Sequence, residues 1–220
     1  MGRSVARRTI ENALRRLGLT AVAGVDEVGR GCLAGPVVAA AVVLDPRRHI
    51  PGLADSKVVP VQERETLYAT IVTAAKAWAV ASVEPVEIDR LNIHRASLWA
   101  MREAVLGLIP LPEVVIVDAF RIPDLPLPQR GIVKGDRRCA AIAAASIVAK
   151  VTRDRMMHEL HRLDPRFGFD HHKGYATREH LDAVARHGYS AAHRRSFRPP
   201  SLFDHADPLT ALEPDLKPDS

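Results

Sequence analysis

The sequence predicts an α/β domain that carries additional helices at its C-terminal end. Short apolar runs typical of strands fall mainly in the first two thirds of the chain. Segments with helical periodicity separate several of these runs, which indicates mixed connections between strands. From residue 139 onwards helical patterns dominate. These three observations together predict the fold class.

The first expected elements are one helix and two strands. Residues 4–18 place three apolar side chains on one stripe of an amphipathic helix. Residues 21–30 form an apolar strand that enters a glycine-rich turn. Residues 37–44 are almost continuously apolar, as expected of a buried strand. The short Gly/Pro link between the two strands predicts an antiparallel return.

Helices and strands then alternate. A helix begins at Pro60 and runs to about residue 76, and a third strand follows at 77–84. Asn92 is a candidate N-cap for a helix that extends to residue 108. The remaining expected elements are strands at 114–118 and 131–134, a long helix at 139–163 with an alanine-rich first half, and a helix from Thr177 to Gly188.

Length and composition indicate a single domain. A chain of 220 residues can bury a substantial core in one domain and is short for two, so we expect residues 1–200 to form it. We expect the acidic, proline-containing residues 201–220 to be a disordered tail. No apolar run is long enough to cross a membrane. Cys32 and Cys139 lack metal-type spacing, so reduced thiols in a cytoplasmic protein are expected.

Positive charge is concentrated near the C-terminus. The formal net charge is +5, and residues 150–200 contain eleven Lys or Arg against six acids. Such a surface suits a polyanionic partner, although a solvated basic face explains the same count. Trp78 and Trp99 stand among apolar residues, so we interpret them as core residues and not as platforms for base stacking.

Acidic residues coincide with the ends of expected elements. Asp26 and Glu27 end the apolar run of the first strand, Asp118 ends the fourth, and Asp136 precedes the alanine-rich helix. Ligands gather where strands of an α/β sheet end, and divalent cations relieve repulsion between carboxylates. Two such ions can orient a water molecule for displacement at phosphorus. The alternative is an exposed acid pair at a turn with Asp136 as a helix cap, and spacing alone does not decide between them.

The neighbouring acids Asp26 and Glu27 pose a geometric problem. Successive side chains of a regular strand face opposite sides of the sheet, so both cannot point at one metal ion from ideal β geometry. The turn Gly29-Arg30-Gly31 follows directly and offers a bulge or a strand end as the solution. If the two acids share one metal site, Asp26 would be its central ligand, and Glu27 would reach it only because the chain leaves β geometry at this turn.

A series of short motifs runs in order from about residue 20 to residue 198. The first is Gly-Val-Asp-Glu-Val-Gly-Arg-Gly at 24–31, which continues into an apolar segment at 33–40. The others are Asp-Ser-Lys at 55–57, Asn-Ile at 92–93, Val-Asp at 117–118, Lys-Gly-Asp at 134–136, the segment 143–155, His-Lys-Gly-Tyr at 172–175 and Arg-Arg-Ser-Phe at 194–197. This ordered set resembles bacterial ribonuclease HII, within the type 2 ribonucleases H.

The resemblance implies a fold and a metal site. The implied fold is ribonuclease H-like, a mixed five-stranded sheet flanked by helices, with an additional helical part at about 150–200. The implied cofactor is Mg²⁺ or Mn²⁺, with two ions during catalysis. The catalytic and metal-binding carboxylates of the family map onto Asp26, Glu27, Asp118 and Asp136.

The resemblance also implies a substrate and a reaction. The partners are RNA–DNA hybrids and DNA duplexes that contain ribonucleotides, and we expect a monomer. The enzyme would cut the RNA strand of a hybrid, or cut 5′ of an embedded ribonucleotide, leaving 3′-hydroxyl and 5′-phosphate ends and starting ribonucleotide removal. Reading of the ribose 2′-OH falls on Gly29, Arg30, Gly31 and Tyr175. Further substrate contacts are assigned to Lys57, Ser146, Lys150 and Lys173.

Some positions depart from the family pattern or admit other interpretations. Ala119 follows the third acid where the family usually has Gly, and Val58 follows Lys57 where another Lys is usual. The second departure removes a positive charge near the expected phosphate path. Lys57 is also compatible with an ordinary surface lysine, and Ser146 with a small packing residue.

Two other functions are compatible with parts of the sequence. One is a different nuclease of the same broad fold, such as a junction resolvase, against which Tyr175 together with the Gly-Arg-Gly turn argues. The other is a catalytically inactive nucleic-acid-binding module. The four intact acids argue against it, because a binding protein gains nothing from negative charge facing phosphates.

Overall fold

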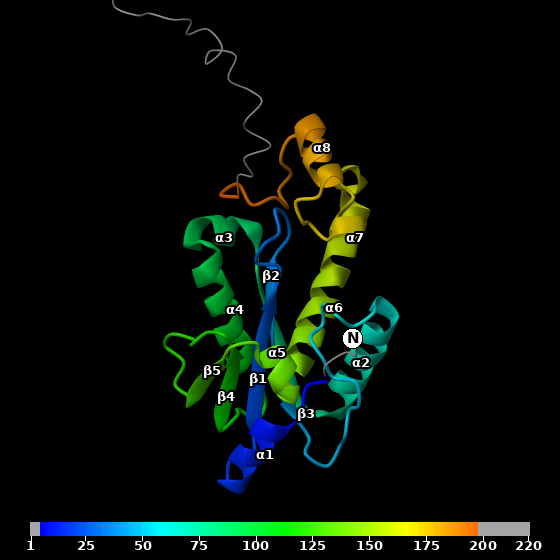
Figure 1. Cartoon of the computed structure of the whole chain (residues 1–220). Coiled ribbons are helices and arrows are strands. Elements are labelled where there is room, and N and C mark those ends of the chain that lie inside the picture. The colour runs from blue at the N-terminus through cyan, green and yellow to red at the C-terminus, as the bar shows by residue number, and fades with distance from the viewer. Residues whose placement is uncertain (1–4, 198–220) are drawn as a thin grey trace, which may run out of the picture.

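The fold is built on one mixed sheet with the strand order β3-β2-β1-β4-β5 (Figure 1). A computed structural model describes residues 5–197. The central strand β1 pairs antiparallel with β2 and parallel with β4, while β3 lies antiparallel to β2 and β5 parallel to β4. The strands are β1 (Val22–Val28), β2 (Val37–Leu44), β3 (Ala75–Val83), β4 (Val114–Asp118) and β5 (Gln129–Ile132). The predicted α/β class with a mixed five-stranded sheet is confirmed.

All the expected helices are present, and several short ones were not expected. The helices are α1 (Thr9–Arg16), α2 (Val61–Ala74), α3 (Pro85–Leu91), α4 (Ile93–Leu106), α5 (Gly135–Arg138), α6 (Ala140–Leu163), α7 (Phe169–His172) and α8 (Arg178–His187), with a 3₁₀ turn at Pro165–Phe167. The sequence did not indicate α3, α5, α7 or the 3₁₀ turn, since each is too short to show periodicity. The fifth strand begins at Gln129, two residues before its expected start.

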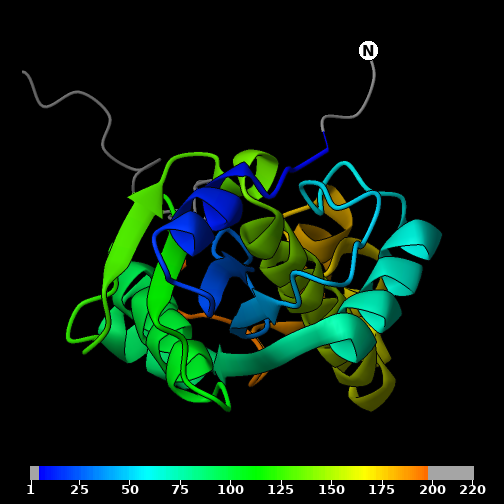
Figure 2. The same ribbon diagram turned by 90° about the horizontal axis from the view of Figure 1, so that it is seen from below.

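Helices cover both faces of the sheet. Alternate residues of β1 and β2 face α6, α1 and α2 on one side, and the intervening residues face α3 and α4 on the other. Figure 2, seen from below, shows β1 and β2 between α6 and α4. Because both faces are covered, β2 is buried along its whole length, which explains its continuous apolar sequence.

Helix α6 lies unusually close to β1 because of Gly24. A Cβ at Gly24 would collide with the backbone of Ala141 and Ile142 in the first turn of α6. The first half of α6 is fully buried and alanine-rich, so no large side chain separates its axis from the sheet. This close approach places the middle of α6 beside the C-terminal end of β1.

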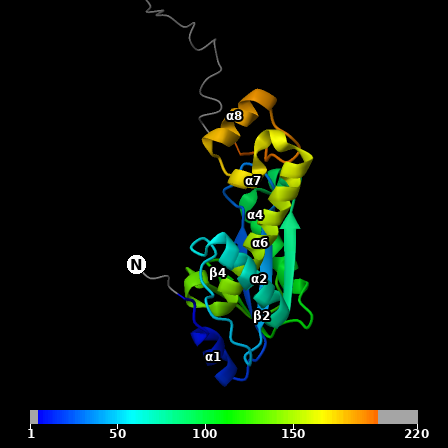
Figure 3. The same cartoon turned by 90° about the vertical axis from the view of Figure 1, so that its right-hand side faces the viewer.

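The C-terminal helices α7 and α8 lie at the opposite end of the molecule from α1 (Figures 1 and 3). They form a small core of their own with Ala34 and Met157, into which Phe167 and Phe169 are buried. This core joins the end of α6 to the turn that follows β1. Residues 201–220, expected to be a disordered tail, lie outside the described residues.

Two expectations about apolar segments are resolved. Trp78 and Trp99 are 40% and 42% exposed, so their interpretation as core residues is wrong. Trp78 lies on the edge strand β3, and Trp99 lies on the outer side of α4, where sequence neighbours say little about burial. Among residues 5–197 no helix is long and apolar enough to cross a membrane.

Candidate active site

Two of the predicted acids lie side by side at the end of the sheet. In the parallel pair β1 and β4, Val25 pairs with Val117, so Asp26 and Asp118 occupy the next position of each strand. Alternation along both strands directs these two acids to the face that α6 covers. Asp26 is only 7% exposed, and its carboxylate accepts hydrogen bonds from the Ser146 hydroxyl of α6 and from the backbone N–H of Glu27.

Glu27 leaves β1 on the opposite face. The register of β1 with β2 is regular from residue 23 to residue 28, so the bulge considered for this acid pair is wrong. The strand ends at Val28, and Gly29 begins the turn with φ +92°. The Glu27 carboxylate accepts a hydrogen bond from Nη1 of Arg30 at 3.3 Å. Arg30 in turn lies over the ring of Phe120, 4.7 Å from its centroid.

Asp136 reaches the site from α5. The backbone N–H of Gly135 donates to Oδ1 of Asp118 at 2.7 Å, which joins the start of α5 to the end of β4. A Cβ at Gly135 would lie 3.3 Å from the same oxygen and would push against the end of the Ile142 side chain, so glycine allows the close approach of α5 to Asp118. Sequence order alone could not show this contact, which brings Asp136 next to Asp118.

Asp118 is the electrostatic centre of the four acids. Burial is the main cause that raises the pKa of Asp26, Glu27 and Asp136, and the charge of Asp118 raises all three further. Asp26 shows the largest increase, because it is buried and also senses Glu27. Asp26 is thus a deeply buried member of the set, whereas Asp118 is the acid whose charge acts on the other three.

The four acids have the chemistry of a divalent-metal site. Their donors are all carboxylate oxygens, which hard cations such as Mg²⁺ and Mn²⁺ prefer. The pKa values of Asp26, Glu27 and Asp136 are raised first by burial and then by the negative charge of neighbouring acids, and a bound cation would oppose both effects. In the described part of the chain, no three Asp, Glu, His or Cys side chains are already gathered as a metal cage. The residues therefore fit the ion by chemistry and by placement at one sheet edge, and their side chains would have to converge on it.

Two buried arginines hold the turn Gly29-Arg30-Gly31 in place. Arg194 donates to the carbonyl oxygen of Arg30 at 3.1 Å and to that of Gly35 at 2.8 Å. Arg153 donates to the carbonyl oxygens of Ala34, Pro36 and Lys173 at 2.9–3.0 Å. Neither side chain is exposed, and burial lowers the pKa of Arg194 to about 10. The sequence places both arginines in the basic segment 150–200, but their guanidinium groups are buried and do not contribute to a basic surface.

The same contacts bring Tyr175 to the turn. The backbone N–H of Leu33 donates to the Gly174 carbonyl oxygen at 2.8 Å, next to the bond between Arg153 and Lys173. Tyr175 is 41% exposed, and its hydroxyl shares a hydrogen bond with the buried Cys32 thiol. Burial of the ring raises the Tyr175 pKa, so the phenol is neutral at physiological pH. The structure thus joins Tyr175 to the turn, as the predicted shared role requires.

The remaining predicted contacts differ in their surroundings. Lys57 is exposed and lies near the acids, since its positive charge partly opposes the rise in the pKa of Asp136. Ser146 is buried between Asp26 and the Ser56 hydroxyl, 2.8 Å away. Lys150 is bound to Asp154 at 2.6 Å, and Nζ of Lys173 lies beside the His158 ring and the Asp170 carbonyl oxygen.

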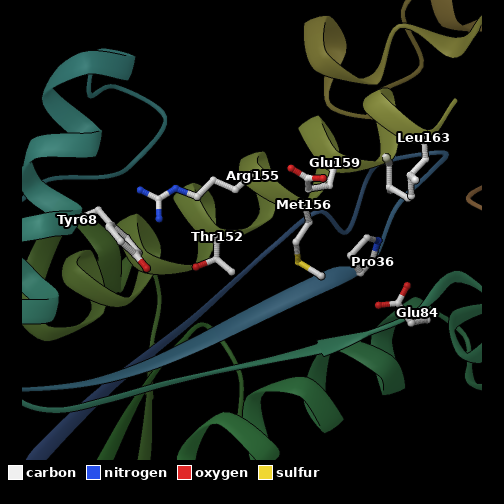
Figure 4. A pocket seen from close by; sticks show the side chains of 9 residues that line it. Pro36, Tyr68, Glu84, Thr152, Arg155, Met156, Glu159 and Leu163 are labelled. Atoms are coloured by element: carbon white, nitrogen blue, oxygen red, sulfur yellow. The ribbon is translucent and has the colours of Figure 1, made fainter. Parts of the chain in front are cut away.

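One pocket of the structure is separate from the acids. A groove of about 640 Å³ opens between α6, α2 and the ends of β2 and β3. Figure 4 shows Tyr68, Arg155, Met156 and Glu84 lining it. None of the four acids lines this groove, so it does not indicate the reaction centre.

Comparisons with known proteins identify the family of the chain. The profile of the family Ribonuclease HII matches residues 23–199. A ribonuclease HII of Bacillus thuringiensis is 51% identical over 189 residues, covering 86% of this chain and 73% of that protein. One from Shewanella amazonensis is 54% identical over 178 residues, covering 81% and 86%. The crystal structure of ribonuclease H2 from Pyrococcus horikoshii superimposes with a TM-score of 0.70 at 26% identity, covering 83% of this chain and 95% of that one. The chain therefore belongs to the ribonuclease HII family, and so to the ribonuclease H enzymes.

Proposed function

We propose that this enzyme cuts the RNA strand of RNA–DNA hybrids and cuts 5′ of ribonucleotides embedded in duplex DNA, leaving 3′-hydroxyl and 5′-phosphate ends. One observation carries the proposal: a cluster of acids around Asp118 lies next to a glycine-rich turn that is joined by backbone contacts to Tyr175. The acids suit phosphodiester hydrolysis. The turn and the tyrosine suit recognition of a single sugar.

Asp26, Glu27, Asp118 and Asp136 are the residues that would hold Mg²⁺ or Mn²⁺. When bound, a pair of such ions supplies an activated water molecule and stabilises the charge that develops on the phosphate. The protein itself fixes Asp26 through Ser146 and fixes Asp118 through the backbone of Gly135. These bonds orient the carboxylates before the substrate arrives, which lowers the cost of ordering them.

The Gly29-Arg30-Gly31 turn would read the ribose. Nothing in the described chain lies within 4 Å of the position of a Gly31 Cβ, so a sugar can approach this backbone closely. The 2′-hydroxyl distinguishes RNA from DNA because it both donates and accepts hydrogen bonds. The exposed ring of Tyr175 would pack against the adjoining sugar. Lys57, Lys150 and Lys173 would neutralise backbone phosphates.

Cleavage of two labelled substrates tests the proposal directly. One is a long RNA–DNA hybrid and the other a DNA duplex with a single ribonucleotide, each assayed with EDTA, Mg²⁺ or Mn²⁺ and with product ends mapped. Asp26→Asn should retain substrate binding while cleavage falls by orders of magnitude. Glu103→Gln, which neutralises an exposed acid on α4, is the matched control. Full activity of Asp26→Asn, or cleavage in EDTA, would remove the metal-site proposal.

A further inference from the structure

Three buried histidines lie beneath the segment that carries Tyr175. His172 ends α7, His180 lies in the first turn of α8, and His193 follows α8. Their exposed fractions are 8%, 0% and 2%. The rings of His172 and His180 stack with centroids 4.4 Å apart, and Phe169 packs edge-on against both. None of these imidazoles has a part in the proposed reaction.

Backbone donors fix the tautomer of each ring. The N–H of Ser190 donates to Nδ1 of His193 at 3.0 Å, and the Ser190 hydroxyl, which accepts the Ala192 N–H, lies 2.8 Å from the same nitrogen and donates to it as well. Nδ1 of His193 therefore carries no proton, and Nε2 must carry it. Nε2 of His193 lies 3.0 Å from Nε2 of His180, which therefore accepts. The proton of His180 then resides on Nδ1, where it donates to the Tyr175 carbonyl oxygen at 2.8 Å.

A backbone donor also fixes the tautomer of His172. The N–H of Gly174 donates to its Nδ1 at 3.2 Å, so the ring proton lies on Nε2 and is donated to the Phe167 carbonyl oxygen at 2.7 Å. Both nitrogens of all three rings are thus engaged. Each ring must be neutral, because an added proton would place two N–H groups against each other.

The backbone of residues 173–175, which these bonds hold, has a conformation that needs support from its surroundings. Lys173 and Gly174 both have positive φ, at 51° and 82°. A non-glycine residue in this region costs free energy, which the surrounding structure has to supply. Arg153 holds the Lys173 carbonyl oxygen on one side, and His172 and His180 hold Gly174 and Tyr175 on the other. The backbone of 173–175 is therefore fixed at three consecutive residues.

We propose that His180, His193 and His172 are positioning residues for Tyr175. His193 and His180 set its backbone through a hydrogen-bond chain of one direction, from Ser190 to the Tyr175 carbonyl oxygen, and His172 holds the preceding residue through the Gly174 N–H. The proposal rests on the sugar-reading role of Tyr175 given above. The histidines do not touch the substrate. They fix where the Tyr175 ring stands relative to the Gly29-Arg30-Gly31 turn.

The tautomers can be measured without any assay of activity. Long-range ¹H–¹⁵N NMR spectra of the full-length protein at pH 7 should show His193 and His172 protonated on Nε2 and His180 protonated on Nδ1. A cationic ring, or a His193 proton on Nδ1, would overturn the chain. This measurement stands even if the proposed function is wrong.

A double-mutant cycle tests the action through Tyr175. Tyr175→Ala should lower kcat/KM on the single-ribonucleotide substrate by about 10- to 100-fold. His180→Phe keeps the ring packing but removes both hydrogen bonds, and it should lower kcat/KM several-fold. Adding it to Tyr175→Ala should cause no further loss, because the two changes act through one group. Losses that multiply in the double variant would contradict the positioning role.

A conservative variant separates positioning from general stability. His180→Asn retains an N–H that reaches the Tyr175 carbonyl oxygen and should recover most of the activity that His180→Phe loses, even at an equal Tm. If both variants lose the same activity, His180 does not act through this bond. If Tyr175→Ala itself is fully active, the sugar-reading role fails, while the NMR result still decides the chain.

Discussion

The guanidinium of Arg153 lies directly beneath Gly29, with no room for a side chain between them. A Cβ at Gly29 would collide with Nε of Arg153 and lie 2.9 Å from the Pro36 carbonyl oxygen. Arg153 cannot withdraw, because each of its three guanidinium nitrogens donates to a carbonyl oxygen, those of Ala34, Pro36 and Lys173. Packing against Arg153 therefore requires glycine at position 29, independently of any role in substrate binding.

Gly29→Ala should impair folding and activity together. The substitution adds a Cβ at φ +92° and displaces a buried cation that holds three carbonyl oxygens. We expect a loss of about 2–4 kcal/mol in the free energy of unfolding, which urea denaturation would measure.

Gly31→Ala is the matched control within the same turn. Gly31 has no positive φ, and no atom lies within 4 Å of its added Cβ. We expect a change in stability of less than about 0.5 kcal/mol and a marked loss of junction cleavage, because the Cβ stands where the sugar approaches. Equal losses of stability in the two variants would contradict this division of roles.

The N-terminal helix α1 stabilises the start of α6 through Glu11. Its Oε1 accepts the backbone N–H of Ala141 at 2.8 Å and the Cys139 thiol at 3.3 Å. The α6 N-terminus receives no side-chain cap from Cys139, the residue before it. Glu11 is therefore the capping acid of a helix 130 positions away in the sequence.

Glu11→Ala should destabilise the protein by about 1–3 kcal/mol, because a buried N–H loses its acceptor and α6 loses its cap. Thermal unfolding followed by circular dichroism measures the change. Glu103→Ala, at an exposed position of α4, should leave Tm almost unchanged. Equal Tm values for wild type and Glu11→Ala would show that the cap contributes nothing.

Local sequence patterns predicted the strands and long helices well, because their periodicity is a property of consecutive residues. Asn92 was expected to cap α4, and its side chain does accept the Arg95 N–H at 3.1 Å. Contacts between distant segments were not predictable in the same way. Glu11 looks like a solvent-facing acid on an amphipathic helix, and only the position of α6 shows that it is buried.

In the candidate site, too, the features that depend on neighbouring residues were predictable and those that depend on distant contacts were not. Asp26 and Asp118 end apolar strands, so the sequence showed that they could meet at one sheet edge. The burial of Arg153 and Arg194 was missed, since a count of charges does not distinguish a basic surface from a buried guanidinium bound to carbonyl oxygens. The one signal available was that both lie within the recognised motifs.

The buried histidines make the stability of the protein depend on pH. Burial is the main cause that lowers the pKa of His180 and His193 from 6.5 to about 4, and it also lowers that of His172. Asp164 opposes the shift of His193, and Glu179 and Asp170 oppose that of His172. Below pH 6.5 these histidines bind protons in the unfolded chain but remain neutral in the folded chain. The histidine contribution to stability is therefore fully present above pH 6.5 and is lost as pH falls towards 4.

This pH dependence can be assigned to the histidines by removing one of them. The unfolding free energy of wild type, measured in urea between pH 4.5 and 7.5, should decline towards the acid end of the range. His180→Phe should decline less steeply, because one group no longer gains a proton on unfolding. His49→Phe, in the loop after β2, removes an exposed imidazole and should retain the wild-type slope. Parallel curves for wild type and His180→Phe would contradict the assignment.

Neutralising Asp26 should separate stability from activity. Its carboxylate is buried beside Glu27 and Asp118, and both burial and these charges raise its pKa. Without a cation, the ionised group therefore opposes folding at neutral pH. We expect Asp26→Asn to raise Tm in EDTA by a few degrees, given that about 1 kcal/mol corresponds to roughly 2–4 °C for a domain of this size. Added Mn²⁺ should raise the Tm of wild type more than that of the variant, because the variant lacks one ligand. A lower Tm for Asp26→Asn in EDTA would show that the hydrogen bonds of Asp26 to Ser146 and Glu27 stabilise the fold more than its burial and the nearby charges destabilise it. The prediction that the ionised Asp26 opposes folding would then be wrong.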